Sequence, residues 1–292
     1  MHKATCWCTL NLLRKTFKDY IYMSTEISTV TPEAANQLAM MLGAVDAPAP
    51  SKNRLPKLKV NTQRKHPYEG QFVIEGEGVE PVFAETVKIR VLSQLFQWLH
   101  YDPEENKVVN KTLMIPNFRH EALDMKGTLR CGKPPSRILR EASKEEQKKY
   151  SDITCFRQLR VIVSYSGKTE DGDDATVENQ PAIMMLKGSN FNPFEDEVMK
   201  VLPKGASTYE YEVEVSAEEM QNGSVIYYVM HFAPNLKTKL PLTDEIYETM
   251  VHMGRLVKDE NEMITLKHQE ALHNENLSSD AIDALAEELE ED

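Results

Sequence analysis

The sequence predicts an α+β protein whose core is an antiparallel β-barrel or a β-sandwich. Apolar and polar residues alternate in several separate segments, which is typical of half-buried strands. Turn residues rather than helices join these segments, and such connections favour hairpins over a doubly wound sheet. Apolar residues that recur every seven positions near the C-terminus indicate one long helix outside the sheet.

The N-terminal segment is expected to lie outside this domain. Residues 1–22 are basic, and the sequence from Met23 reads like an ordinary start, so we expect a leader that is disordered or not translated. Thr31 is typical of a helix N-cap, and the helix should end at Leu42, just before a glycine. Residues 23–56 are therefore interpreted as an N-terminal helix followed by a proline-rich linker.

Residues 57–240 form the expected β-rich domain. Val87, Ile89 and Val91 alternate with cationic residues, and the strand pattern continues through Phe96 and Trp98. We interpret this stretch as the first strand of a long hairpin whose exposed face carries both cations and aromatic rings. An OB-like barrel with insertions is the preferred architecture, and a helix-covered sandwich is the alternative. Strands are expected at 82–101, 107–115, 156–165, 177–186, 207–215 and 224–232, and short helices at 143–150 and 193–201.

The C-terminal end combines a helix with an acidic tail. Thr243 is a predicted N-cap, and the seven-residue repeat places the C-terminal helix at 241–273. Residues 274–292 form a tail that we expect to be disordered. Its last sixteen residues carry seven acids and no Lys or Arg, with a thin apolar stripe at helical spacing. The tail is either a solubilising end or a segment that docks on a basic groove. In the second case the partner-binding residues are Asp280, Ile282, Asp283, Leu285, Glu287, Glu288, Leu289, Glu290, Glu291 and Asp292.

Charge is distributed unevenly along the chain. Residues 1–150 hold 23 Lys and Arg against 17 Asp and Glu, whereas residues 151–292 hold 11 against 29. A basic half joined to an acidic one indicates polyanion binding beside an acidic tail. The sequence has no apolar run long enough to span a membrane, and its four cysteines are scattered, so we expect a cytoplasmic protein.

The motifs of common enzymes and metal sites are missing from the sequence. It contains no phosphate-binding glycine loop, dinucleotide fingerprint, nucleophile elbow or two-histidine zinc helix. His120, Cys131 and Cys155 fall in the basic region, but they are widely spaced and lack the fourth ligand of a structural zinc site. We therefore expect a protein that is not an enzyme and that needs no metal or cofactor.

Binding of single-stranded nucleic acid is the function that the residue pattern favours. Such binding requires cations along the phosphates and aromatic faces on which bases stack. In the alternative interpretation the aromatic residues belong to the core and the basic segment is an ordinary solvated face. The expected nucleic-acid-binding residues are Lys57, Lys59, Arg64, Lys65, Lys88, Arg90, Trp98, Tyr101, Arg119, Lys126, Arg130, Lys133 and Arg137.

A basic, strand-rich body followed by the acidic segment Asp280–Asp292 resembles the replication single-stranded DNA-binding proteins of bacteriophages. The resemblance implies an OB-fold groove that binds DNA in replication or recombination, in the cytoplasm of the host. It also implies that the tail recruits polymerase, helicase or recombination proteins and competes for the groove. The tail lacks the terminal aromatic residue of some members, and the body lacks the zinc-ligand set of one branch.

A phage-type structural or protein-interaction factor is the alternative function. The helix at 243–272 would then form a homodimer or dock on a partner, and the tail would act as a charge decoy. An enzyme whose site leaves no recognisable motif is a third possibility.

Overall fold

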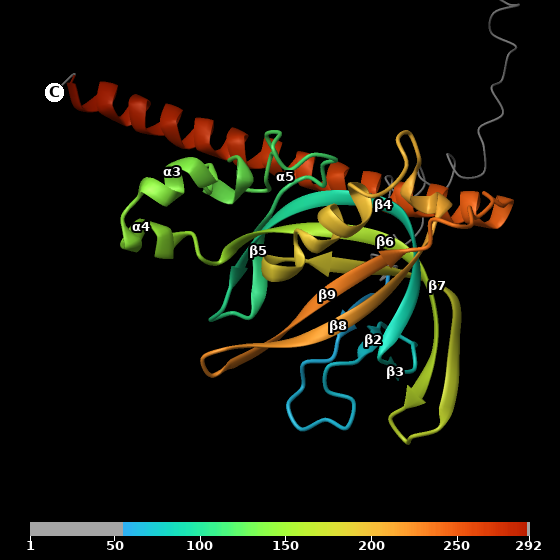
Figure 1. Ribbon diagram of the computed structural model, residues 1–292. Coiled ribbons are helices and arrows are strands. Elements are labelled where there is room, and N and C mark those ends of the chain that lie inside the picture. The colour runs from blue at the N-terminus through green and yellow to red at the C-terminus, as the bar shows by residue number, and fades with distance from the viewer. Residues whose placement is uncertain (1–54, 291–292) are drawn as a thin grey trace, which may run out of the picture. The chain divides into compact units, whose positions relative to one another are not determined.

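The computed structural model describes residues 55–290, with side chains described as far as Asn274 (Figure 1). The expected leader and N-terminal helix lie outside the described residues, as do Glu291, Asp292 and the other tail side chains. The strands are β1 Lys57–Val60, β2 Phe72–Glu75, β3 Val82–Ala84, β4 Thr86–Asp102, β5 Lys107–Lys111, β6 Ile153–Thr169, β7 Asp174–Leu186, β8 Glu212–Asn222 and β9 Val225–Pro234. The helices are α3 Ser136–Glu141, α4 Lys144–Lys149 and α5 Asp244–Glu290, and the short turns are η1 Arg130–Gly132, η2 Gly188–Asn190, η3 Glu195–Met199 and η4 Thr208–Glu210.

The described strands form one mixed sheet. Its order is β3-β2-β1-β7-β6-β4-β8-β9, with β5 paired to β4. The α+β class is confirmed, but the sheet is not wholly antiparallel, because β1 and β7 pair in parallel at Lys57 and Ile183. β3 also pairs with β6. Gly167 permits this pairing, since a Cβ at that position would lie 2.0 Å from the carbonyl oxygen of Phe83.

A β-bulge in β4 decides which of its side chains face the main core. Up to Val91, the odd-numbered residues of β4 pack in the core with odd-numbered residues of β6 such as Val161. The register between the two strands shifts between Val91 and Ser93. A one-residue shift moves every later side chain to the other face of a strand.

The bulge places the aromatic residues of β4 on a different face from its cations. Beyond it, Trp98 pairs with Cys155 of β6, and paired residues share one face of a sheet. Phe96 and Trp98 therefore lie on the core side, whereas Lys88 and Arg90 lie on the opposite side. The prediction of one exposed face that carries both cations and rings is wrong for this reason.

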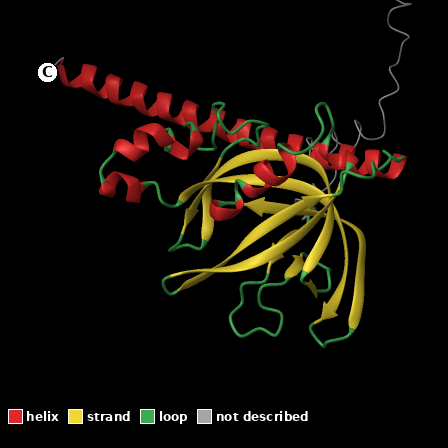
Figure 2. Ribbon diagram, in the orientation of Figure 1, coloured by secondary structure: helices red, strands yellow, loops and turns green. Residues whose placement is uncertain are grey.

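Helix α5 packs along the face of β4 and β6 that is opposite to the main core (Figure 2). The helix begins as predicted, because Thr243 Oγ1 accepts a hydrogen bond of 3.4 Å from the amide of Ile246. Met253 is buried against Leu92 and Ile162. The carboxamide of Asn261 also bonds the backbone of Met114 twice, as acceptor at 2.8 Å and as donor at 3.0 Å.

The C-terminal helix is longer than the sequence predicts. α5 runs to Glu290 instead of ending at 273, so the backbone of residues 274–290 is helical where a disordered tail was expected. Two residues of the seven-residue repeat face the body of the chain: Met250 packs against the cluster of Leu92 and Ile162, and Ile264 is fully buried. Within the described part of the chain, no helix combines the length and apolar character needed to cross a membrane.

The strand predicted at 82–101 is two strands in the structure, β3 and β4, and the other predicted strands differ in their bounds, most clearly those at 107–115 and 207–215. β5 ends at Lys111, and only an isolated bridge joins Phe96 to Ile115 further on. The strand expected at 207–215 begins with the turn η4, and β8 starts at Glu212. A reciprocal pair of hydrogen bonds between Ser207 and Glu210 closes this turn, and such a capping box competes with strand pairing.

Candidate nucleic-acid interface

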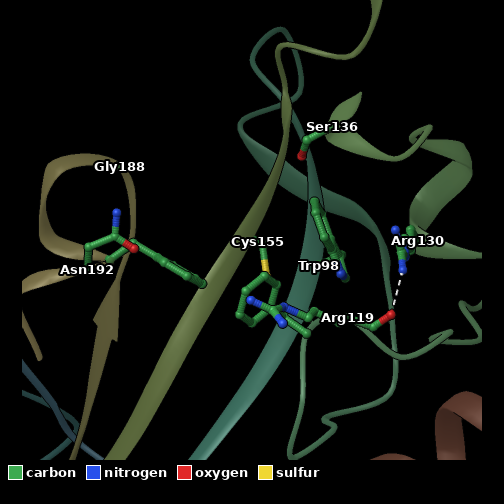
Figure 3. Close-up of a pocket in the computed structure, with 9 residues that line it drawn as sticks. Trp98, Arg119, Arg130, Ser136, Cys155, Gly188 and Asn192 are labelled. Atoms are coloured by element: carbon green, nitrogen blue, oxygen red, sulfur yellow. Dashed lines mark hydrogen bonds between the residues drawn. The ribbon is translucent and has the colours of Figure 1, made fainter. Parts of the chain in front are cut away.

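A pocket of about 490 Å³ lies on the inner side of β4 and β6. Trp98 of β4 and Cys155 of β6 lie side by side in it, because they are paired across the two strands. Figure 3 shows Gly188 and Asn192 on one side of Cys155, with Trp98 and Arg130 on the other. Five chain segments that are distant in sequence therefore meet here, and the lining residues are Trp98, Phe118, Arg119, Arg130, Ser136, Cys155, Gly188, Phe191 and Asn192.

Trp98 is held through its backbone and through its ring. Its amide donates a hydrogen bond of 3.0 Å to Thr112 Oγ1, and its carbonyl accepts one of 3.0 Å from the Thr112 amide. The guanidinium carbon of Arg130 lies 5.9 Å from the centre of the indole, within the range of a cation–π contact. The indole Nε1 is buried and has no hydrogen-bond partner among the described residues.

A turn of left-handed backbone carries Arg130 to the indole. Arg130, Cys131 and Gly132 have φ angles of +52°, +57° and +77°. Holding a residue other than glycine in this region costs about 1–3 kcal/mol, and such strain is concentrated at functional sites. The Arg130 guanidinium donates a hydrogen bond of 3.0 Å to the carbonyl of Arg119 (Figure 3), which ties the turn to the neighbouring loop.

A buried guanidinium lies behind the aromatic side of the pocket. Arg157 is only 2% exposed, and its guanidinium carbon lies 5.1 Å from the centre of the Phe191 ring and 5.2 Å from that of Phe96. Burial lowers the pKa of Arg157, and a hydrogen bond of 3.1 Å to Glu195 opposes this shift. Phe118 packs edge-to-face on Phe191 at 5.6 Å. The rings of Phe118 and Phe191 are thus packed against each other, and Phe191 is also packed against the Arg157 guanidinium.

The electrostatic environment of the pocket is positive. Burial raises the pKa of the Cys155 thiol to about 12, and the charges of Arg130, Arg157 and Lys133 act in the opposite direction. Three cations therefore lie close enough to act on a side chain that lines the pocket. The lining residues include no Asp or Glu. An anionic ligand is the one that such a site favours.

Thiol and metal chemistry receive no support from the same region. Burial and the nearby charge of Asp124 raise the pKa of Cys131 to about 12 as well. Neither Cys131 nor Cys155 is a thiolate near neutral pH, and the thiolate is the form that attacks substrates or ligates metals. Across the residues that the structure describes, no three His, Cys, Asp or Glu side chains are grouped so that they could hold a metal ion.

The structure brings together only some of the predicted binding residues. Trp98, Arg119 and Arg130 line the pocket, and the guanidinium of Arg119 is exposed beside the ring of Phe118. Lys133 lies close by, but its ammonium group donates to the carbonyl of Ile153. This ammonium group is therefore anchored to the protein itself.

Several predicted cations away from the pocket have partners within the protein. Lys59, Arg64 and Lys88 form ion pairs with Glu75, Glu69 and Glu212, at 2.6, 3.8 and 3.3 Å. Arg90 donates to the carbonyl oxygens of Tyr209 and Pro241, at 2.6 and 2.7 Å. These contacts give Arg90 a structural role, because they tie the segment before α5 to the sheet. The exposed residues Lys57, Lys65, Tyr101, Lys126 and Arg137 do not line the pocket. In Figure 1 the loop between β1 and β2, which carries Lys65, lies away from α3.

Sequence reasoning missed several residues of the pocket. Phe118 had a usable signal, since it directly precedes the predicted Arg119. Phe191, Asn192 and Cys155 had none, because nothing local says that η2 and β6 meet β4 at this point. Comparisons with protein-family models, with curated proteins and with solved structures find no match to this chain.

Proposed function

We propose that the protein binds single-stranded DNA without sequence preference through the pocket formed by Trp98, Arg119 and Arg130. The observation that carries the proposal is the convergence of one indole and two guanidinium groups from three separate segments. Cations that neutralise phosphates, together with rings that stack on bases, are sufficient for binding that tolerates any sequence. A role in replication or recombination, with the acidic residues at 280–292 recruiting partner proteins, completes the proposal.

An OB-like barrel is the architecture that we propose for the β-rich domain. Strand pairings run from β3 through β2, β1, β7 and β6, and β6 pairs in turn with β3. This circuit of pairings supports closure of five strands around the main core. A sandwich would leave β3 and β6 unpaired with each other.

The protein-interaction alternative has less support. Met253, on the apolar face of α5, is already buried against Leu92 and Ile162 of the sheet, and Ile264 is fully buried as well. A dimer formed through this face would have to displace α5 from β4 and β6. The exposed apolar residues of α5 do not recur every seven positions; they are Tyr247, Val251, Met263, Leu266 and Leu272.

Titration of a labelled oligo-dT at several salt concentrations tests the proposed function. We expect tight binding at low salt, with log affinity falling by about 0.7 per phosphate contact for each tenfold rise in salt. A duplex of the same length serves as the control for general attraction between charges. No binding at low salt, or an affinity that does not change with salt concentration, would refute the proposal.

A further inference from the structure

The pocket has two aromatic sides and a neutral thiol between them. Arg130 backs the indole of Trp98 on one side, while Gly188 and Asn192 lie on the other (Figure 3). The face of the indole that is turned away from Arg130 is therefore the one open to a ligand. Phe191 adds a second ring to the lining of the same pocket.

We propose that this pocket holds one unstacked nucleobase of the bound strand, with a phosphate next to that base on Arg119. The inference rests on the proposed function and names the unit that the site recognises. Arg119 suits the phosphate because its guanidinium is exposed and has no acidic partner among the described residues. The base would be withdrawn from its neighbours and stacked on the indole.

The chemistry of the lining fits a base better than a phosphate alone or an apolar group. A phosphate cannot stack on the rings of Trp98 and Phe191, whose flat faces attract another flat ring. An apolar ligand would leave the exposed polar groups of Ser136 and Asn192 in the lining without partners. A base supplies both a flat face and acceptor atoms.

The rim of the pocket explains how such a site tolerates different bases. Ser136 and Asn192 are exposed polar residues of the lining. A hydroxyl and a carboxamide each donate and accept hydrogen bonds, so they adapt to different base edges. The pocket thus selects a base over an abasic sugar, but it does not read sequence.

Oligomers that differ only in their bases provide the test. Three strands of about nine nucleotides carry the same phosphates: all thymine, all abasic, and abasic with a single central thymine. We expect the single thymine to raise affinity on the order of 10-fold over the abasic strand, and further thymines to add little. The fluorescence of Trp98, measured in a Trp7→Phe protein, should be quenched by the strands with thymine and not by the abasic one.

Each outcome of this comparison has a distinct meaning. If all three strands bind with equal affinity, the one-base pocket is refuted while DNA binding stands. If affinity rises by the same factor with every added thymine, the bases stack along a surface and the inference is also refuted. If none of the strands binds at low salt, the proposed function itself fails.

Substitutions in the pocket test whether it causes the preference for thymine. Cys155→Phe should fill the space between the rings and abolish the preference for thymine, while binding of the abasic strand is kept. Phe191→Leu removes one ring with little loss of volume and should weaken the preference in a protein that stays folded, as thermal melting would verify. Tyr101→Leu is the matched control, because Tyr101 is an exposed aromatic residue of the same strand as Trp98 and does not line the pocket. An undiminished thymine preference in a folded Phe191→Leu protein would overturn the inference.

Discussion

Replacing the two pocket guanidiniums by neutral side chains is the most direct test of the proposed interface. Arg119→Gln removes an exposed charge that makes no hydrogen bond to the described protein through its side chain, so we expect no loss of stability. Arg130→Gln removes a second charge and the bond to the carbonyl of Arg119. Glutamine is chosen at Arg130 because glycine would also relieve the left-handed backbone there.

The expected size of the effect follows from counterion release. If each guanidinium contacts one phosphate of a single strand, the double variant should have a salt slope shallower by about 1.4. Between about 50 and 200 mM salt the double variant should therefore lose about sevenfold less affinity than the unmodified protein. Fluorescence anisotropy of labelled oligo-dT measures both slopes, and urea unfolding verifies that the variants are folded.

A matched control separates a local contact from a change in net charge. Lys258→Gln/Lys267→Gln also removes two charges, at exposed positions of α5 where Lys258 is paired with Glu262 at 3.6 Å. We expect this variant to keep the original salt slope. Equal slopes for the folded Arg119→Gln/Arg130→Gln protein and for the control would refute the assignment of the pocket to phosphate binding.

Three further predictions concern stability and the tail. Arg160 is buried under α5, and its Nε and one terminal nitrogen have no hydrogen-bond partner among the described residues. Arg160→Met should therefore stabilise the protein by about 1 kcal/mol in urea unfolding. A loss of stability would show that these nitrogens do have hydrogen-bond partners in solution. Gly167→Ala should destabilise the protein by at least about 2 kcal/mol, because the new Cβ collides with the backbone of β3, and an unchanged melting temperature would contradict the β3–β6 pairing. Ending the chain after Glu275 removes the acidic residues at 280–292 and should strengthen oligo-dT binding, most clearly at low salt where screening is weakest; equal affinities for the intact and shortened chains would leave the tail as a solubilising end.

Most of the secondary structure follows from local patterns in the sequence. The alternation at Val87, Ile89 and Val91 identifies β4, because burial of one face imposes a period of two on any strand. The seven-residue repeat and Thr243 identify the position and start of α5, since a helix buries one stripe and needs a cap. These signals depend only on residues that are close together in the sequence, so the sequence alone reveals them.

The faces, partners and ends of these elements depend on contacts that are distant in sequence. One extra residue near Leu92 reverses the direction of Trp98, and nothing in the local pattern marks that residue as a bulge. The sequence predicts the end of α5 too early, because the acidic segment has too little apolar surface to indicate a helix.

The candidate site shows the same division between local and distant information. Composition and charge identify Trp98, Arg119 and Arg130 as residues suited to nucleic acid, because cations and rings have that chemistry wherever they lie. Only the tertiary structure separates them from Lys88 and Arg90, which lie on the opposite face of the sheet with partners of their own. The pocket exists because β4, β6, η2 and two loops meet at one place, and this meeting is set by strand pairing across the whole domain. Local chemistry therefore identifies the suitable side chains, and the fold selects those that lie together.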